Sequence, residues 1–295
     1  MELRLRNAKR VYLRGTKFPI MKKILVATDF SSAANNAVNY AAHLAHEINA
    51  SLVLFHSYAV PVVVAEAPVL IPTLEEVEID SEKRLKQIKK RLNEKYNHAI
   101  HIEEACSCGF AVDEIKKFVA EHHVDMVIMG MHGLGAVGEK IIGSTTTSLM
   151  SEIQIPVICI HEKNTFDAYK KIVFACDFGD FKNTKIFEPI KTFVNLFHSK
   201  LYILNVFSKS HSEPTITEAV ASLRLDQVLA NVNHQLCYVE NKDVIAGINQ
   251  FVKENHIDLV IMMPRSHSFI DKLFKEPHTK KMAFHSHIPI MAIHE

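Results

Sequence analysis

The sequence predicts an α/β fold made of two tandem copies of one doubly wound domain, each with a parallel sheet covered by helices on both faces. Two observations support this prediction. Short apolar runs alternate with segments whose apolar residues recur at helical spacing, which is typical of a parallel sheet buried on both sides. In addition, several segments of the first half return in the second half.

The repeated segments show how the two halves correspond. The matching pairs are 23–30 (KILVATDF) with 171–178 (KIVFACDF), 124–129 (VDMVIM) with 257–262 (IDLVIM), and 155–162 (IPVICIHE) with 288–295 (IPIMAIHE). The last two pairs share one offset, so the sequence between them aligns without a gap. We therefore predict one domain over residues 21–162 and a second over residues 170–295, with a polar boundary near residues 163–169.

The first copy begins with a strand at residues 24–27 and a helix after it. The apolar residues of this helix recur at helical spacing and are Ala34, Ala37, Val38, Ala41, Ala45 and Ile48. Residues 52–55 form the second strand. Residues 58–73 are interrupted by proline and are predicted to form a loop.

The second part of this copy continues the alternation. A charged helix with inward-facing Leu85, Ile88 and Leu92 precedes a third strand at residues 100–105. The remaining predicted elements are a helix at 111–122, a strand at 124–129, a helix at 144–152 and a last strand at 157–160. In doubly wound sheets, ligands bind beyond the carboxyl ends of the strands, so the segments that follow the first and fourth strands are expected to converge.

Composition limits the classes of function. The length of 295 residues suits two ordinary domains, and the formal net charge of +1 gives no reason to expect a nucleic-acid partner. No apolar run is long enough to cross a bilayer, so no membrane partner is expected. Residues 1–20 are basic and lack a sustained apolar stretch. We predict an extension outside the fold, with a basic partner-binding arm as the alternative.

The cysteines predict a cytoplasmic protein with reduced thiols. There are five of them, an odd number, and several stand in apolar surroundings. The pair Cys106 and Cys108 suggests a metal site at first sight. No second pair stands at the spacing of a zinc site, so no metal is predicted.

A glycine pattern after the fourth strand carries the strongest functional signal. Gly130 and Gly133 are followed, after nine intervening residues, by Gly143 and Ser144 at a predicted helix start. Glycine lets the backbone approach a ligand closely, and a helix N-terminus offers unpaired N–H groups and partial positive charge. A strand, a glycine-bearing loop and a Ser/Thr-rich helix start together predict a phosphate-binding site.

Together with residues 27–31 (ATDFS), this pattern resembles the universal stress protein family. The ATP-binding members of this family carry the motif Gly-x2-Gly-x9-Gly-(Ser/Thr), in which x is any residue. Residues 130–144 match this motif in full. The resemblance covers residues 21–162 and, more weakly, 170–295. It implies a five-stranded parallel sheet of strand order 3-2-1-4-5 in each copy. It also implies ATP, with or without Mg²⁺, as the ligand.

The resemblance implies that the adenine and ribose lie near Asp29 and the phosphates near the glycine loop. The matched binding residues are Ala27, Thr28, Asp29, Ser57, Met129, Gly130, His132, Gly133, Gly143, Ser144 and Thr145. Their chemistry agrees, because a carboxylate can accept hydrogen bonds from ribose hydroxyls and Ser/Thr hydroxyls can donate to phosphate. Each residue also has a simpler role: Asp29 or Ser144 as a helix cap, and His132 as a solvated loop residue.

The second copy departs from the pattern at the decisive positions. The residues that replace Gly130, His132, Gly133, Gly143 and Ser144 are Met263, Arg265, Ser266, Glu276 and Pro277. The larger side chains would fill ligand space, Glu276 would repel a phosphate, and Pro277 lacks an N–H group. Asp177 keeps the first-strand half of the site. We therefore expect only the first copy to bind ATP.

The prediction for the whole chain is a tandem universal stress protein that acts as a nucleotide-dependent regulator of a stress response. Strands 157–160 and 290–293 are expected to pair within the chain as an intramolecular pseudo-dimer, which would satisfy exposed edges. The sequence does not decide whether two whole chains also form a homodimer.

Two alternative functions are a slow ATPase or phosphotransferase and a ligand-free partner-binding scaffold. No catalytic residue is assigned, since no Walker-type Gly-Lys-Ser/Thr sequence, arginine finger or convincing water-activating base is found. Phosphate binding alone would stabilise the ground state, whereas catalysis needs stronger binding of the transition state.

Overall fold

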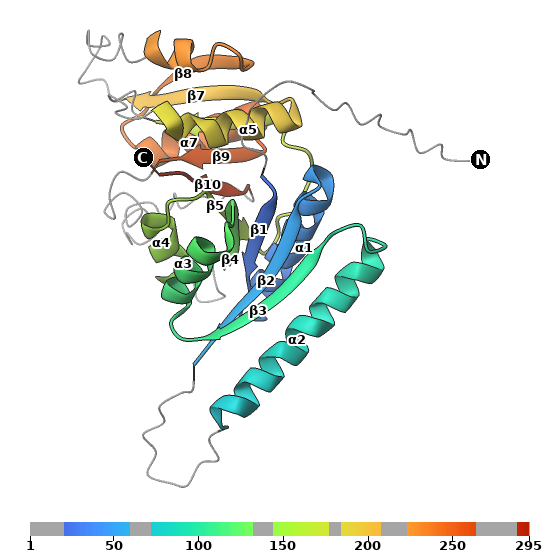
Figure 1. Cartoon of the computed structure of the whole chain (residues 1–295). Coiled ribbons are helices and arrows are strands. Elements are labelled where there is room, and N and C mark those ends of the chain that lie inside the picture. The colour runs from blue at the N-terminus through green and yellow to red at the C-terminus, as the bar shows by residue number, and fades with distance from the viewer. Residues whose placement is uncertain are drawn as a thin grey trace, which may run out of the picture.

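The computed structural model describes residues 21–59, 72–131, 144–176, 184–207, 223–263 and 288–294. Its described strands form a ten-stranded sheet of order β3-β2-β1-β4-β5-β10-β9-β6-β7-β8 (Figure 1). Each half therefore has the strand order 3-2-1-4-5 that the resemblance implies. The predicted α/β fold, with a mostly parallel sheet in two tandem halves, is confirmed.

The strands of the two halves occupy equivalent places. Those of the first half are β1 (Lys23–Ala27), β2 (Ser51–Tyr58), β3 (Ile102–Cys108), β4 (Met126–Met131) and β5 (Val157–His161). Those of the second half are β6 (Lys171–Ala175), β7 (Lys200–Phe207), β8 (His234–Glu240), β9 (Leu259–Met262) and β10 (Ile290–Ala292). All neighbours within each half are parallel.

Helices cover both faces of the sheet. The described helices are α1 (Ser32–Ile48), α2 (Leu74–Lys95), α3 (Ala111–His122), α4 (Ser144–Glu152), the short 3₁₀ helix η1 (Thr184–Ile186), α5 (Phe187–Phe197) and α7 (Val244–Asn255); residues 223–228 are also helical. One core cluster joins α1, α2 and α5 to one face, and another joins α3, α4 and α7 to the other. Neither cluster is confined to one half, so the two copies share their cores.

The predicted carboxyl ends of three strands were wrong, and hydrogen bonding explains these shifts; β3 and β4 also begin two residues later than predicted, at Ile102 and Met126. Strand β2 continues to Tyr58 because it stays paired with β3, which itself runs to Cys108 rather than ending at 105. Strand β4 continues to Met131 because Gly130 and Met131 pair with Ile160 and His161 of β5. Gly130 is therefore part of a strand and not of the loop that follows it.

The two halves meet where β5 and β10 pair antiparallel. Ile158 lies opposite Met291, and both residues are fully buried. This contact provides each of the two strands with a hydrogen-bonded neighbour on the side where its own half ends. The predicted pairing of the last strands within the chain is therefore present.

A repeated aspartate anchors the start of the first strand of each half. Asp125 Oδ2 accepts the backbone N–H groups of Lys22 and Lys23 at 2.7 and 2.9 Å. Asp258 Oδ2 accepts those of Lys170 and Lys171, both at 2.8 Å. The duplication thus preserves a hydrogen-bonding arrangement as well as a sequence pattern.

The segment between the halves, predicted to be a polar boundary, carries two aromatic side chains that pack against the core. Tyr169 is 1% exposed, and its hydroxyl lies 2.6 Å from that of Tyr40 on α1. Phe166 packs edge-on against both rings, with centroid distances of 5.2 Å to Tyr40 and 5.5 Å to Tyr169. These aromatic contacts hold the connecting segment, residues 163–169, against the shared core.

Several predictions lie beyond the described part of the chain. They concern residues 1–20, most of the predicted loop 58–73, and the glycine loop with its counterpart in the second half. No described helix has the length and the apolar character needed to cross a membrane.

Candidate functional site

A cavity opens at the carboxyl ends of β1, β2 and β4. The predicted binding residues that line it are Ala27, Thr28, Asp29, Ser57, Met129, Gly130 and Thr145. The cavity holds about 170 Å³, which is below the 300 Å³ or more that is usual for a small-molecule pocket. His132, Gly133 and Gly143 lie outside the described residues, as does the side chain of Ser144 at the start of α4.

Other lining residues were missed by the sequence analysis. They are Ser31, Ala34, Phe55, Ala111, Ile115 and Thr146. Ser31 and Phe55 stand close to predicted residues in the sequence, and Thr146 directly follows Thr145. Ala111 and Ile115 belong to α3, and no motif marks them. Only the packing of α3 against the sheet brings them to the cavity.

A hydrogen-bonded turn at residues 28–31 presents Asp29 to the cavity. The Thr28 N–H donates to the carbonyl of Phe55 at 2.9 Å, and Thr28 Oγ1 accepts the Phe30 N–H at 3.0 Å. Asp29 Oδ1 accepts the Ser31 N–H at 2.9 Å. The cap of α1 is Ser31, whose hydroxyl accepts the Ala34 N–H at 3.2 Å. Asp29 therefore stabilises the turn and does not cap the helix.

Gly130 allows β4 to lie directly against the first turn of α1. A Cβ at this position would stand 2.6 Å from the carbonyl carbon and oxygen of Ala33 and 2.8 Å from the Ala34 nitrogen. These atoms are backbone and cannot move without moving the helix. The glycine is thus needed for packing, and it also brings the start of α1 to the edge of the cavity.

The start of α4 forms another side of the cavity. Thr145 and Thr146 both line it, and Thr146 is only 4% exposed. A helix N-terminus carries partial positive charge and N–H groups without intrahelical partners. Anions are favoured at such a place, so this side of the cavity is chemically suited to phosphate.

The second half differs at the position equivalent to Gly130. Met263 is 8% exposed there and belongs to the core cluster that also contains Phe174 and Phe187. A core side chain therefore stands where the first half has a glycine. Asp177, Arg265, Ser266, Glu276 and Pro277 lie outside the described residues.

His56 is a further residue beside the turn that the sequence analysis did not select. Its Nδ1 lies 2.7 Å from the Thr28 carbonyl oxygen, and its ring centroid lies 4.4 Å from that of Phe30. Burial lowers the pKa of His56, opposed by the hydrogen bond to Thr28. The neutral imidazole is therefore favoured and supports the turn from the side of β2.

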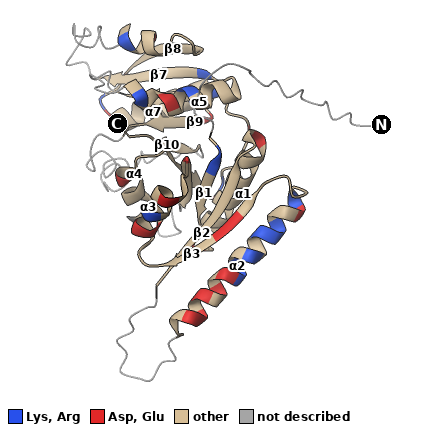
Figure 2. Cartoon of the chain, viewed as in Figure 1, with Lys and Arg blue, Asp and Glu red and all other residues tan. Residues whose placement is uncertain are grey.

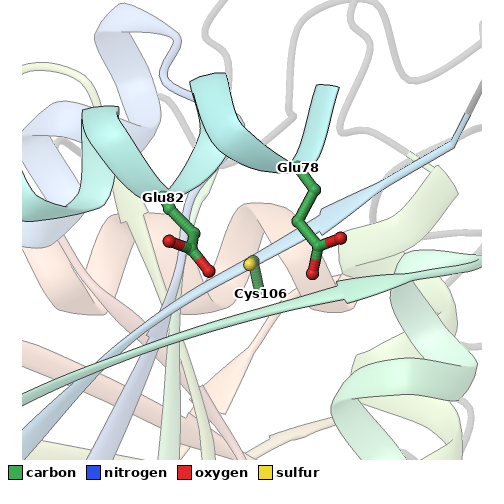
Figure 3. Close-up of side chains that lie close together, drawn as sticks. All are labelled: Glu78, Glu82 and Cys106. Atoms are coloured by element: carbon green, nitrogen blue, oxygen red, sulfur yellow. The ribbon is translucent and has the colours of Figure 1, made fainter. Parts of the chain in front are cut away.

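A group of possible metal ligands lies between α2 and the edge strand β3, and none of its members lines the cavity. Figure 3 shows Glu78 and Glu82 of α2 pointing toward Cys106 of β3. One ligand atom of each lies within 4.8 Å of the others, and both carboxylates are exposed. Burial and the two carboxylates raise the pKa of the Cys106 thiol, which disfavours the thiolate that metals bind. We assign no metal to this group.

Comparison with known proteins agrees with the fold and the repeat. The model of the universal stress protein family matches residues 21–161 and again residues 168–294. A universal stress protein of Mycolicibacterium smegmatis is 32% identical over 146 residues, which cover 47% of each chain. Universal stress protein MJ0577 of Methanocaldococcus jannaschii is 27% identical over 86 residues, covering 29% of this chain and 51% of the relative. The chain thus spans about half the length of these two curated relatives.

A solved structure resembles the chain over nearly its whole length. The crystal structure of a universal stress protein from Archaeoglobus fulgidus has a TM-score of 0.67 with 15% identity. The match covers 93% of this chain and 98% of that one. At this identity the likeness concerns the fold of both halves.

Proposed function

Because this chain belongs to the universal stress protein family, we propose that it binds one adenine nucleotide, in its first half, and acts as a nucleotide-dependent stress-response regulator. One observation carries the proposal. Asp29, Gly130 and Thr145 come from three separate segments and line one cavity at the carboxyl end of the sheet. That is where ligands bind in doubly wound folds.

The chemistry of the cavity suits the parts of a nucleotide. The Asp29 carboxylate would accept hydrogen bonds from ribose hydroxyls, and Ser57 and Met129 would lie beside the adenine. The phosphates, with or without Mg²⁺, would lie toward Thr145 and the start of α4. The cavity enclosed by described residues is too small for a whole nucleotide. His132, Gly133, Gly143 and Ser144 would supply the rest of the site.

The second half would not bind ATP in the same way. Met263 is a buried core residue at the position of Gly130, so its side chain takes up space near the carboxyl end of β9. Glu276 and Pro277 would oppose phosphate through charge and through a missing N–H group. One nucleotide per chain is the expected stoichiometry.

The proposal is tested on the purified full chain. Mass spectrometry of the denatured protein should detect a released adenine nucleotide, and millimolar ATP with Mg²⁺ should raise the Tm. A ligand at a hundred times its Kd stabilises the native state by about 2.7 kcal/mol. Asp29→Asn should weaken this effect, whereas the matched change Asp177→Asn in the second half should not. Neither bound nucleotide nor a thermal shift would favour a ligand-free scaffold.

The proposal is a binding function, with hydrolysis slow or absent. Multiple turnovers of ATP by the purified chain, lost in Asp29→Asn, would instead indicate an ATPase. We also propose that the protein works in the cytoplasm. None of the five cysteines, all of which lie among the described residues, forms a disulfide, as is usual for proteins in a reducing compartment.

A further inference from the structure

A second cavity lies between the start of α1 and the side of α2. It is lined by Phe30, Asn35, Arg84, Gln87, Ile88 and Arg91 and holds about 380 Å³. No lining residue is shared with the first cavity. We propose that this cavity binds a small organic anion, whose charged group is held by Arg84 and Arg91 and whose apolar body packs against Phe30 and Ile88.

The positive side of the cavity is one face of α2. Residues 84, 87, 88 and 91 follow the spacing that places side chains on the same side of a helix. The carboxyl-terminal half of α2 is predominantly basic, whereas its beginning is acidic (Figure 2). An anion that enters between α1 and α2 would therefore meet the basic half of the helix.

Both arginines retain donors for a ligand. Arg84 Nε pairs with Asp80 Oδ2 at 2.7 Å, and that pair is more than half exposed. A guanidinium has five N–H donors, and Nε carries only one of them, so the terminal amino groups can face the cavity. Arg91 makes no salt bridge with the acidic side chains that the structure describes. The guanidinium groups of Arg84 and Arg91 thus outnumber the one described carboxylate, that of Asp80, which pairs with either of them. Guanidinium groups bind carboxylate and phosphate groups through paired hydrogen bonds.

The apolar side is fixed before any ligand arrives. Phe30 has a positive φ of 65°. Its N–H donates to Thr28 Oγ1 and its carbonyl accepts a hydrogen bond from Asn35 Nδ2, both at 3.0 Å, and these bonds hold the backbone in place. The Arg84 guanidinium carbon lies 5.3 Å from the centroid of the Phe30 ring, within cation–π range. Ile88 is 8% exposed and belongs to the core. Because Phe30 and Ile88 are already ordered in the free protein, less conformational entropy is lost when a ligand binds.

Titration calorimetry of the full chain with phenyl phosphate tests the proposal, because this probe carries both an anionic group and an apolar body. Inorganic phosphate and phenol each lack one of the two and should bind at least about tenfold more weakly, equivalent to about 1.4 kcal/mol. Arg91→Gln and Arg84→Gln should each weaken phenyl phosphate binding by about tenfold or more. Lys90→Gln removes a charge from α2 outside the cavity lining and should leave binding unchanged.

Three results would overturn the proposal. One is the absence of phenyl phosphate binding at ten millimolar probe. Another is binding that is unchanged in the double variant Arg84→Gln/Arg91→Gln. The third is binding that survives in the double variant but is lost in Asp29→Asn, because the probe would then occupy the first cavity. Failure of the chain to bind ATP would leave this proposal unaffected, since neither the probe nor the two arginines belong to the proposed nucleotide site.

Discussion

Gly130 has a packing role in addition to the binding role that we propose for it. The sequence suggested that a glycine here leaves space for a ligand. The structure adds that β4 and the first turn of α1 approach so closely that even a methyl group would meet backbone atoms. Sequence alone could not predict this, because the contact joins residues about a hundred positions apart. The same contact sets the shape of the cavity edge at Ser31 and Ala34.

Gly130→Ala should therefore lower stability as well as nucleotide affinity. Overpacking of this kind costs about 1–3 kcal/mol, which urea unfolding would measure. Gly247→Ala in α7 is the control: its added Cβ meets the side chain of Val206, at 2.5 Å, rather than backbone. Alanine favours the helix by about 1 kcal/mol, which offsets part of this crowding, so a smaller net loss is expected. Equal losses in the two variants would contradict the account.

The Tyr40–Tyr169 pair predicts a loss of stability in alkali. Burial raises the pKa of both hydroxyls. A raised pKa of an acid means that the folded state holds its proton longer than the unfolded chain, in which tyrosine titrates near pH 10. The contribution is complete below pH 10 and falls above it, by at most about 1.4 kcal/mol per pH unit for each tyrosine.

Tyr169→Phe separates this effect from other titrations. Urea unfolding between pH 8 and pH 11 should show a shallower decline above pH 10 in the variant than in the parent chain. At pH 8 the variant should be less stable by about 1 kcal/mol, because the buried Tyr40 hydroxyl loses its partner. Identical slopes in the two proteins would argue against the buried pair as the cause.

At the scale of elements, the repeated aspartates hold the beginnings of β1 and β6. Each accepts two backbone N–H groups at equivalent places in the two halves. Asp125→Ala and Asp258→Ala should each cost about 1–3 kcal/mol of unfolding free energy, since the N–H groups lose a charged acceptor. Asparagine keeps an acceptor oxygen and should cost less at both positions. An effect in only one half would show that the arrangements are not equivalent.

The existence and order of most elements followed from the sequence, because their apolar periodicity is strong. Strand ends did not, because pairing with a neighbour decides where a strand stops. Strands β2 and β4 both run beyond their apolar runs, through Ser57 and Gly130, and remain paired there. Two predicted site residues thus lie on rigid strands rather than on loops. The role of α3 in the cavity depends on tertiary packing and left no signal in the sequence.

At the scale of the whole molecule, the two halves should unfold together. They share both core clusters and are joined by the β5–β10 pair. The predicted polar boundary gave no hint that Phe166 and Tyr169 also bind the halves to each other. This contact arises because aromatic side chains in a connecting segment can fill the space between two cores.

Ile158→Ala tests this shared core. Ile158 is fully buried at the seam, so its truncation should cost about 2–5 kcal/mol. Differential scanning calorimetry should show one transition in the parent chain and one, at lower temperature, in the variant. Ile79→Ala, at a position that is 59% exposed, should change stability by no more than about 0.5 kcal/mol. Two separate transitions, only one of which shifts, would show that the halves unfold independently.

We propose that the first half binds a nucleotide, whereas the matching position of the second half is filled by a core side chain. Met263 is part of the core where the first half has Gly130, and the two halves nonetheless keep the same strand order. A chain of this kind can hold a ligand in one half while the other contributes to the shared cores. We propose that this asymmetry limits the chain to one nucleotide.

Titration calorimetry of the full chain with ATP and Mg²⁺, on protein freed of bound nucleotide, tests that claim most directly. The account predicts one nucleotide per chain. Binding should be weakened in Asp29→Asn and abolished by Gly143→Glu, which introduces the residue of the second half, and it should be unchanged in Asp177→Asn. Two nucleotides per chain, or one that persists in Gly143→Glu and is lost in Asp177→Asn, would contradict it.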